Sequence, residues 1–349
     1  MTALATIALD AMGGDNAPRI VVRGANIARR RYPGVRFRLF GDERRIAPLL
    51  KRMPKLRKVI AIDHTEEVVT DDDKPSQALR QGKRSSMRLA INAVRDGEAE
   101  GVVSAGNTGA LMAMAKFTLK TLPGIDRPAI AAVFPNHRSE SVMLDLGANV
   151  ECDADNLIQF AIMGSEFGRT VLGLKDPSVG LLNVGTEEVK GHEAVRQAAA
   201  ILRAKNAAIR YHGFVEGDDI AMGTVDVIVS DGFSGNIALK TIEGSVKLYT
   251  EFLRRAFKSS LSARLGYLLA RRSLNKLRAR VDPRRYNGAM FLGLNGTVVK
   301  SHGSTDAFGF ANAIGVAVDM AAHRFNERII AQLDGGGLSV PVRTRAAAS

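Results

Sequence analysis

Five short segments rich in Gly, Asn, Asp, Ser and Thr carry the residue types that an anion-binding site needs. They start at Asp10, Ser104, Asn183, Ser230 and Ser301, and each lies between a short apolar run and a helical pattern. Glycine lets the backbone approach a ligand closely, and the N–H groups at a helix N-terminus attract negative charge. Ordinary turns and helix caps use the same residue types. One such segment is weak evidence, whereas five in one chain favour a phosphate or carboxylate site.

All five segments supply candidate binding residues. These are Asp10, Gly13, Gly14, Asp15, Asn16, Gly106, Thr108, Gly109, Asn183, Gly185, Thr186, Asp231, Gly232, Gly235, Asn236, Gly303 and Ser304. Asp10 and Asp231 each end a strand pattern, where they would orient donors or, as we favour, brace the loop. Loops that follow the strands of an open parallel sheet lie at its carboxyl edge, so we expect all five loops at one edge.

Two side chains in these segments are candidates for acting on a bound anion. Lys190 lies at the start of a helical pattern, where it would neutralise phosphate charge; a solvated lysine is the alternative. His302 lies in a Gly-Ser-Thr loop, where it would donate a hydrogen bond to an oxyanion; the alternative is a histidine that braces the loop.

Several well-known catalytic motifs are missing from the sequence. It contains neither G-x-x-x-x-G-K-[ST] nor G-x-G-x-x-G, and His192-Glu193 is not followed by the second histidine of a zinc helix. The single cysteine, Cys152, lies among acids that would raise its thiol pKa, and one cysteine fits a reducing compartment. We therefore expect no covalent nucleophile, no fixed metal and no cofactor.

The elements that must position these loops alternate between strand and helix. Strand patterns are predicted at 3–9, 35–40, 59–62, 101–104, 129–134, 141–145, 179–183, 225–229 and 297–300. Helical patterns are predicted at 18–31, 86–95, 109–122, 156–167, 192–204, from 235 onward and at 307–333. This alternation predicts an α/β fold with a mostly parallel sheet and helices on both faces. The neighbouring strands near 129 and 141 are candidates for an antiparallel pair.

We expect one catalytic domain over residues 1–334, with an irregular polar stretch at 63–85 and a disordered tail at 335–349. The first ten residues are typical of a strand rather than of a signal peptide. The sequence has no unbroken apolar run of the roughly 18 residues that a membrane span needs.

Most of the net charge of +13 belongs to one segment, residues 246–285, which has twelve Lys or Arg against two acids. The pattern predicts a pair of basic amphipathic helices. A dimer contact, an anionic lipid surface and an acidic protein partner are all open alternatives. The rest of the chain is nearly balanced, which argues against a nucleic-acid binder. The candidate contact residues are Phe252, Arg254, Arg255, Phe257, Lys258, Leu265, Leu268, Arg271 and Arg272.

Taken together, these loops make the chain resemble the phosphate acyltransferase family (PlsX). The motifs that carry the resemblance are Ala8–Pro18, Ser104–Met112, Gly124–Ala129, Asp145–Val150, Val179–Glu187 and Ser230–Asn236. The resemblance runs from about Ile7 to Leu333. One departure is Tyr286-Asn-Gly-Ala, where the family usually has Tyr-Gly-Gly-Ala. This departure leaves the backbone path of that loop open.

The resemblance implies transfer of an acyl group from acyl carrier protein to inorganic phosphate, giving acyl phosphate for phospholipid synthesis. It also implies a homodimer with a fold similar to phosphotransacetylases and isocitrate-type dehydrogenases. The product would pass to a membrane glycerol-3-phosphate acyltransferase, so we expect a cytoplasmic protein at the inner face of the cell membrane. Asn107, Asn236 or His302 would then supply the oxyanion donor, and Lys190 would hold phosphate.

Three other functions stay open from the sequence. A phosphotransacetylase would use a small acyl-CoA, and a decarboxylating dehydrogenase would need metal-binding acids and a nicotinamide site. A basic scaffold on membranes or nucleic acid would leave the five glycine loops unexplained.

Overall fold

The computed structural model describes residues 5–204 and 209–335. Within these ranges eleven strands form one sheet, in the order β3-β2-β1-β4-β11-β10-β5-β6-β9-β7-β8. The strands are β1 (Thr6–Asp10), β2 (Arg36–Gly41), β3 (Ile60–His64), β4 (Gly101–Ser104), β5 (Ala129–Pro135), β6 (Glu140–Leu144), β7 (Ser178–Leu182), β8 (Arg210–Val215), β9 (Val227–Val229), β10 (Ala289–Leu292) and β11 (Thr297–Lys300).

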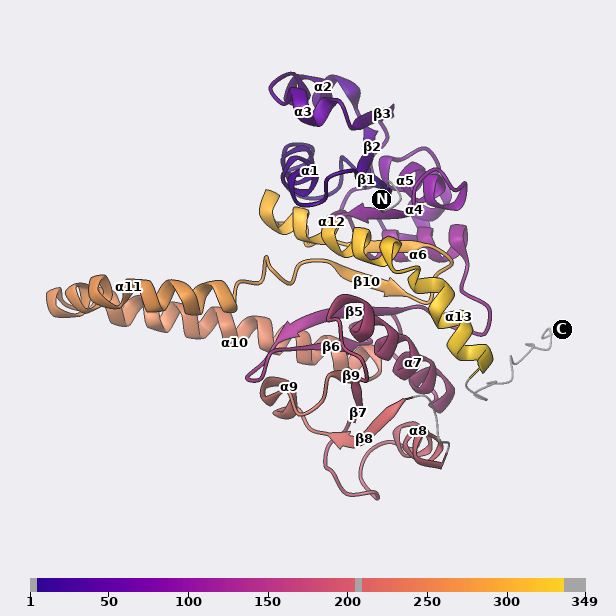
Figure 1. The fold of residues 1–349 in the computed structure, drawn as a ribbon, viewed down its shortest axis with the longest axis vertical. Helices are drawn as coiled ribbons and strands as arrows, with labels where there is room; N and C mark the ends of the chain where they lie inside the picture. The colour runs from indigo at the N-terminus through magenta and orange to yellow at the C-terminus, as the bar shows by residue number, and fades with distance from the viewer. Residues whose placement is uncertain (1–4, 205–208, 336–349) are drawn as a thin grey trace.

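Helices cover both faces of this sheet, as the sequence predicts (Figure 1). On one face α1, α2, α3 and α12 pack on the first half of the sheet, and α7, α8 and α13 pack on the second half. The opposite face is covered by α4, α5 and α6, and then by α9 and the start of α10. The helices are α1 (Arg19–Arg31), α2 (Glu43–Lys51), α3 (Pro54–Arg57), α4 (Pro75–Gln81), α5 (Ser86–Arg95), α6 (Thr108–Leu119), α7 (Ala154–Val171), α8 (Glu193–Ala204), α9 (Asp219–Met222), α10 (Gly232–Lys258), α11 (Leu261–Arg280), α12 (Ala307–Ala322) and α13 (Phe325–Gly335).

The direction of the strands reverses across the middle of the sheet. The strands β3, β2, β1, β4 and β11 are parallel to one another. Next, β10 is antiparallel to both β11 and β5, and β5 is antiparallel to β6, as expected for that pair. The strands β6, β9, β7 and β8 are again parallel to one another. Three successive antiparallel pairings make these two parallel groups run in opposite directions.

This reversal shows that the prediction of one shared edge for all five loops is wrong. The loops after β1, β4 and β11 lie at one edge, which we call the first edge. The loops after β6, β7 and β9 lie at the opposite edge, which we call the second edge. The short strand β10 was not predicted from the sequence. Because its two antiparallel pairings cause part of the reversal, the reversal was not predicted either.

Other differences have local causes. The stretch 63–85, expected to be irregular, contains the helix α4, whose single buried residue, Ala78, gives almost no periodic signal. The helix predicted over 307–333 is two helices, because Arg324 between α12 and α13 has a left-handed φ of 49°. Neither α2, α3 nor β8 was predicted. Of the tail predicted to be disordered, Gly335 ends α13, and residues 336–349 lie outside the described residues.

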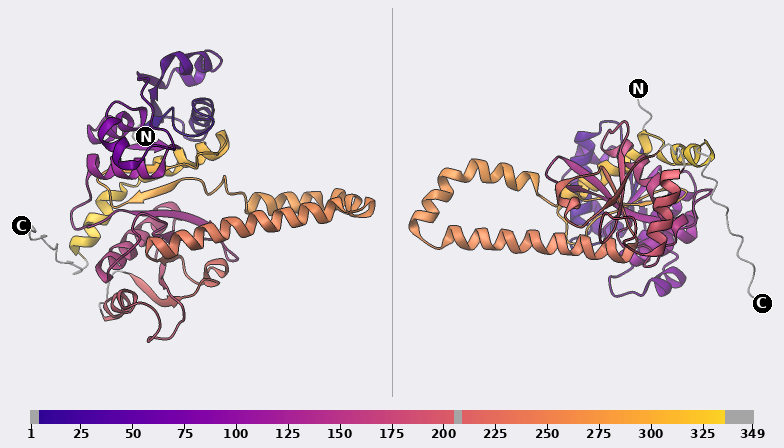
Figure 2. Two further views of the ribbon diagram at one scale, coloured as in Figure 1. Left: turned by 180° about the vertical axis from the view of Figure 1, so that it is seen from behind. Right: turned by 90° about the horizontal axis from the view of Figure 1, so that it is seen from below.

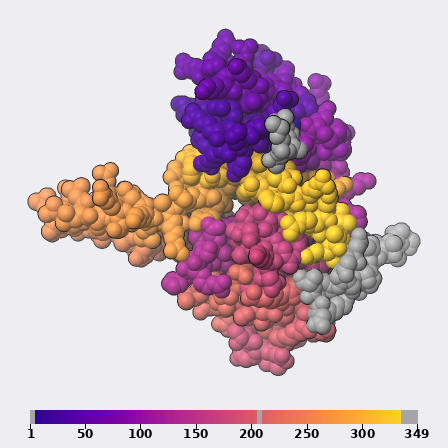
Figure 3. Space-filling model, viewed as in Figure 1, coloured from indigo at the N-terminus to yellow at the C-terminus, as the bar shows by residue number. Residues whose placement is uncertain are grey.

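The helices α10 and α11 form a long hairpin that extends away from the sheet (Figures 1 and 2). In the space-filling view this hairpin stands out from the body of the molecule (Figure 3). Within the hairpin the rings of Phe257 and Tyr267 pack against each other, with their centroids 5.4 Å apart. Helix α11 has no buried residue, so most of its surface is open to solvent.

Candidate active site

Asp10, the last residue of β1, ties together three elements at the first edge. Its buried carboxylate accepts hydrogen bonds from Ser104 Oγ at 2.6 Å, Ser86 Oγ at 2.7 Å and the Met12 amide at 3.2 Å. Burial raises its pKa, while the hydroxyl and amide donors oppose that rise. These contacts are those of a carboxylate that braces its loop. Ser86 and Ser104 were not among the candidates.

Glycines let the three loops of the first edge pack closely. A Cβ atom on Gly13 would lie 2.5 Å from Asp10 Oδ2 and 2.7 Å from the Gly106 amide nitrogen. The Asp15 amide donates to the Gly303 carbonyl at 3.1 Å, which joins the loop after β1 to the loop after β11. The structure therefore brings together the candidates of three segments, which are far apart in the sequence.

Lys300, the last residue of β11, is a functional candidate that the sequence analysis missed. Its half-buried ammonium group donates to the carbonyls of Ala105, at 3.4 Å, and of Ser301. Burial lowers its pKa to about 8, against the opposing effect of Asp71, Asp10 and Asp15. Many strands end in a lysine where the chain leaves the sheet. The sequence around Lys300 therefore does not mark it as a site residue.

His302 lies in the loop after β11, two residues beyond Lys300, and is exposed. Its Nδ1 accepts a hydrogen bond from the Ser304 amide at 3.2 Å, so the neutral ring carries its proton on Nε2. Asn287 ties this loop to helix α12 through three hydrogen bonds. Its amide donates to Ser301 Oγ and the Gly309 carbonyl, both at 2.8 Å, and its oxygen accepts from the His302 amide at 2.9 Å. The departure from the family pattern thus adds a brace beside His302.

Asn107 caps helix α6 at the first edge. Its oxygen accepts from the Ala110 amide at 3.0 Å, and its amide group donates to the carbonyls of Thr70, Asp71 and Asp73. An oxyanion role for Asn107 would require these bonds to break. Thr108 and Gly109, in the first turn of α6, are exposed.

At the second edge, Asp145 organises the loop after β6. Its buried carboxylate accepts from the amides of Ile130, Ala148 and Asn149 at 2.7–3.0 Å, and burial raises its pKa against these bonds. A Cβ atom on Gly235 would lie 1.9 Å from the Asp145 carbonyl oxygen, so the start of α10 lies directly against this loop. Asp231 caps α10 through the Ser234 amide at 2.7 Å, as expected of a bracing residue. Asn236 is exposed in the first turns of α10.

The loop that carries Lys190 follows β7 at the same second edge. The side-chain amide of Asn183 donates to the carbonyls of Gly185 and Lys190, both at 3.1 Å, and so closes the loop on itself. Gly191 has a left-handed φ of 86° and leaves no room for a Cβ atom beside Asn183. Lys190 and Thr186 are exposed. Asn183 thus braces the loop, and Lys190 is open to a ligand.

Cys152, beside the loop after β6, is not suited to act as a nucleophile. Burial, and then the charges of Asp145 and Asp231, raise the pKa of its thiol to about 12. The direction agrees with the prediction, although burial rather than the neighbouring acids is the main cause.

Nearly all candidate contact residues on the hairpin are exposed. Phe257 is the exception, because it is half-buried against Tyr267. Arg254 and Arg255 both donate to Glu251, and these bonds lower the pKa of Glu251 to about 2. In the part of the chain that the structure describes, no helix is long and apolar enough to cross a bilayer. The other exposed contact residues are Phe252, Lys258, Leu265, Leu268, Arg271 and Arg272.

Comparison with solved structures supports the α/β fold. The chain is similar to a phosphotransacetylase from Streptococcus pyogenes, with a TM-score of 0.62 and 18% identity over 91% of this chain and 94% of that one. It is also similar to the EutD phosphotransacetylase from Staphylococcus aureus, with a TM-score of 0.59 and 17% identity over 92% and 96% of the two chains. At this identity the likeness concerns the fold alone.

Sequence relatives are much closer. The chain is 67% identical to a phosphate acyltransferase of Rhodospirillum centenum, over 98% of both proteins. It is 61% identical to a phosphate acyltransferase of Paramagnetospirillum magneticum, over 96% of this chain and 95% of the relative. The family model described as "Fatty acid synthesis protein" matches residues 5–328. With the glycine loops of both edges inside that match, the chain belongs to the phosphate acyltransferase family and is an acyltransferase of fatty acid synthesis.

Proposed function

We propose that this acyltransferase moves a long-chain acyl group from the thioester of acyl carrier protein to inorganic phosphate, for phospholipid synthesis. An oxygen of HPO₄²⁻ attacks the thioester carbonyl carbon, and the C–S bond breaks as the new C–O bond is retained. The phosphate proton passes to the departing thiolate, so the products are acyl phosphate and the free thiol. Phosphate is itself a nucleophile, so the protein has to orient both reactants and stabilise the oxyanion.

The observation that carries this proposal is a pair of donors, Lys300 at the end of β11 and His302 in the loop that follows. Two of the three N–H groups of Lys300 are engaged with carbonyls, which leaves one for a substrate. Two residues later, His302 keeps its proton on Nε2, the form that donates to an oxyanion. The loop after β1 lies close to this loop, since a Cβ atom on Gly14 would lie 3.0 Å from the Gly303 carbonyl oxygen.

In this proposal, Lys190 and Asn236 act on the substrate from a second copy of the chain. They follow strands that run opposite to β11, so within one chain they lie at the other edge. Both sets can act on one substrate only if the second edge of one copy meets the first edge of another. A homodimer with symmetric copies would supply two such composite sites.

The hairpin supports a donor carried by an acidic protein and a product delivered at a membrane. Its basic side chains are exposed, and Leu261, Leu265, Leu268 and Leu269 are all at least 60% exposed. Leucine beside arginine is the pattern of a surface that touches anionic lipid. The acyl phosphate would pass there to a membrane glycerol-3-phosphate acyltransferase.

The test is to incubate the purified protein with palmitoyl carrier protein and phosphate, and to trap acyl phosphate with hydroxylamine. Phosphate-dependent hydroxamate is the expected result. Product from acetyl-CoA but not from the carrier protein would replace the proposal with a phosphotransacetylase of small acyl groups. No product from either donor would refute it.

A further inference from the structure

A pocket of about 520 Å³ opens between helices α1, α7 and α12 and the segment after α11. This volume is typical of sites for small molecules, which range over roughly 300–1,000 Å³. None of its lining residues was a candidate in the sequence analysis, so its chemistry has to be taken from the structure.

The pocket lies beside the loop after β11. Its lining residues 285–288 lead into β10, whose first residue, Ala289, pairs with Lys300. Asn287 belongs to the lining, and its side-chain oxygen accepts from the His302 amide at 2.9 Å. A ligand in the pocket would therefore lie next to the candidate site, on the face of the sheet that α1, α7 and α12 cover.

One side of the pocket carries an arginine without a partner. Among the described residues, none forms an ion pair or a hydrogen bond with the guanidinium group of Arg285. The carboxylates of Asp282 and Asp306 both pair with the neighbouring Arg284 instead, at 2.7 and 2.8 Å. The guanidinium group of Arg285 is thus available to a ligand.

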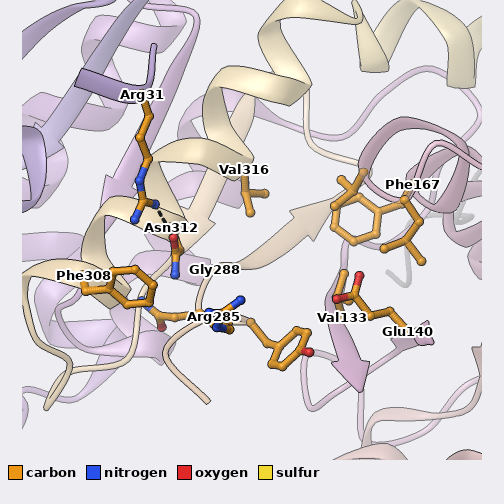
Figure 4. Close-up of a pocket in the computed structure, with 13 residues that line it drawn as sticks. Arg31, Val133, Glu140, Phe167, Arg285, Gly288, Phe308, Asn312 and Val316 are labelled. Carbon is orange, nitrogen blue, oxygen red and sulfur yellow. Dashed lines mark hydrogen bonds between the residues drawn. The ribbon is translucent and has the colours of Figure 1, made fainter. Parts of the chain in front are cut away.

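A second arginine, Arg31, lies on the same side of the pocket (Figure 4). Its guanidinium group donates to Asn312 Oδ1 at 2.5 Å and lies over the Phe308 ring, with its central carbon 5.0 Å from the ring centroid. These contacts hold the group in place without neutralising it, because neither partner is charged. Two such arginines favour an anionic ligand, and the planar array of N–H groups on each guanidinium suits phosphate oxygens.

The opposite side of the pocket is polar as well as apolar. Figure 4 shows Glu140 beside Val133 there, and Phe167 in the same wall is only 1% exposed. Burial, and then Glu140, raise the pKa of the Tyr286 phenol, so the carboxylate lies close to that hydroxyl group. A hydrocarbon chain in this space would remove the Glu140 carboxylate from water without a hydrogen bond, which is costly. Hydroxyl or amide groups of a ligand would instead donate to it.

We propose that this pocket binds a phosphate ester with a polar body, with the phosphate at Arg285 and Arg31 and the hydroxyl or amide groups of the body at Glu140. Two sources have this chemistry. One is the phosphopantetheine arm of acyl carrier protein, which carries a phosphate and amide groups; this source rests on the proposed function. The other is a small free ester such as glycerol 3-phosphate, which is independent of that function.

The experiment is calorimetry on the whole protein with three probes, which are phosphopantetheine, glycerol 3-phosphate and propyl phosphate. Propyl phosphate matches glycerol 3-phosphate in size but lacks its hydroxyl groups. At least one polar ester is expected to bind roughly tenfold tighter than propyl phosphate, through hydrogen bonds to the body. Tighter binding of phosphopantetheine than of glycerol 3-phosphate assigns the pocket to the carrier arm, and the reverse order assigns it to a free ester.

Variants test whether the ester binds in this pocket. Arg285→Gln is expected to weaken binding of the preferred ester at least about tenfold. Arg30→Gln is the matched control, because Arg30 is exposed and outside the pocket, and it should bind as wild type. Glu140→Leu should remove the preference over propyl phosphate. All three side chains are exposed, so the fold is expected to survive, with circular dichroism as the check.

Three results would overturn the proposal: no binding of either polar ester, equal binding of these esters and propyl phosphate, or equal binding by wild type and Arg285→Gln. Because no acyl group is transferred in this measurement, the two proposals fail separately. A protein that makes acyl phosphate but fails here refutes only the pocket. One that binds an ester but makes no acyl phosphate refutes only the proposed function.

Discussion

At the scale of residues, the first edge places charged groups where water is scarce. Lys300 lies half-buried among three acids, yet its ammonium group bonds directly only to two carbonyls. Burial of a lysine favours its neutral form, and the acids only partly restore the charge. A lysine with a pKa of about 8, two residues before His302 in the chain, is a candidate for stabilising charge that develops during acyl transfer.

Lys300→Met is expected to lower kcat/KM for acyl transfer by about 100-fold, because it removes a donor aimed at developing charge. The measurement is initial hydroxamate formation, with circular dichroism to verify the fold. Lys300→Arg keeps the charge and should retain more activity than Lys300→Met. Equal loss in both variants would mean that shape, rather than charge, matters at this position.

The pH profile gives a separate test of Lys300. The protonated form is the donor, so activity is expected to fall as pH rises through about 8, the pKa of this group. Arginine stays protonated throughout this range, so Lys300→Arg should shift the alkaline decline to higher pH. An unchanged alkaline limb in that variant would assign the decline to another group.

Asn287→Gly, which restores the usual family residue, is expected to destabilise the protein by about 1–3 kcal/mol through loss of three hydrogen bonds. Urea unfolding measures this change. Asn287→Asp provides the comparison, since it keeps the acceptor for the His302 amide but loses both donors. If Asn287→Gly unfolds at the same urea concentration as wild type, the brace contributes nothing.

At the scale of elements, the hairpin of α10 and α11 has little packing of its own. The two helices meet through pairs such as Phe257 and Tyr267, while leucines and arginines face outward. A helix that exposes apolar residues usually buries them against a partner. The basic residues beside these leucines favour a surface that is both apolar and anionic.

The double variant Leu265→Ser and Leu268→Ser is expected to reduce binding to anionic vesicles at least about tenfold, because each leucine loses its burial in lipid. Vesicle cosedimentation measures this. Phe117→Ser is the control, since Phe117 is 67% exposed but lies on α6, away from the hairpin. Equal binding by the double variant and the control would exclude the leucines as the lipid contact.

At the scale of the whole molecule, the reversed sheet separates the candidates into two sets. His302 and Lys300 lie at the first edge, and Lys190 and Asn236 lie at the second. A parallel sheet throughout would have gathered them at one edge. The separation gives the proposed homodimer a chemical role, which is to join the two edges.

Mixing Lys190→Ala with His302→Ala tests this role. Each variant alone is expected to be strongly impaired, and an equal mixture should recover roughly a quarter of wild-type activity, because half of the dimers then contain one intact composite site. Subunits must be exchanged or coexpressed for the measurement. No recovery in verified mixed dimers would show that the composite site is wrong.

The sequence alone determined the local parts of this protein. Helix α5 and strands β4 and β11 have the bounds that their patterns predict, because apolar periodicity and capping residues act over a few neighbours. The glycine loops, the bracing roles of Asp10 and Asp231, and the family followed from residues that are contiguous in the chain. The basic helix pair was predicted for the same reason.

Only the tertiary structure decided how these parts meet. The short strand β10 has no pattern of its own, yet its pairings with β11 and β5 help to reverse the sheet and divide the loops between two edges. Lys300 ends an ordinary strand, and its environment comes from loops some 200–300 residues away in sequence. The sequence shows that Asn287 departs from the family pattern. It does not show the hydrogen bonds that Asn287 makes to Ser301 and Gly309. Long-range pairing and burial set these features, and neither is encoded in a local pattern.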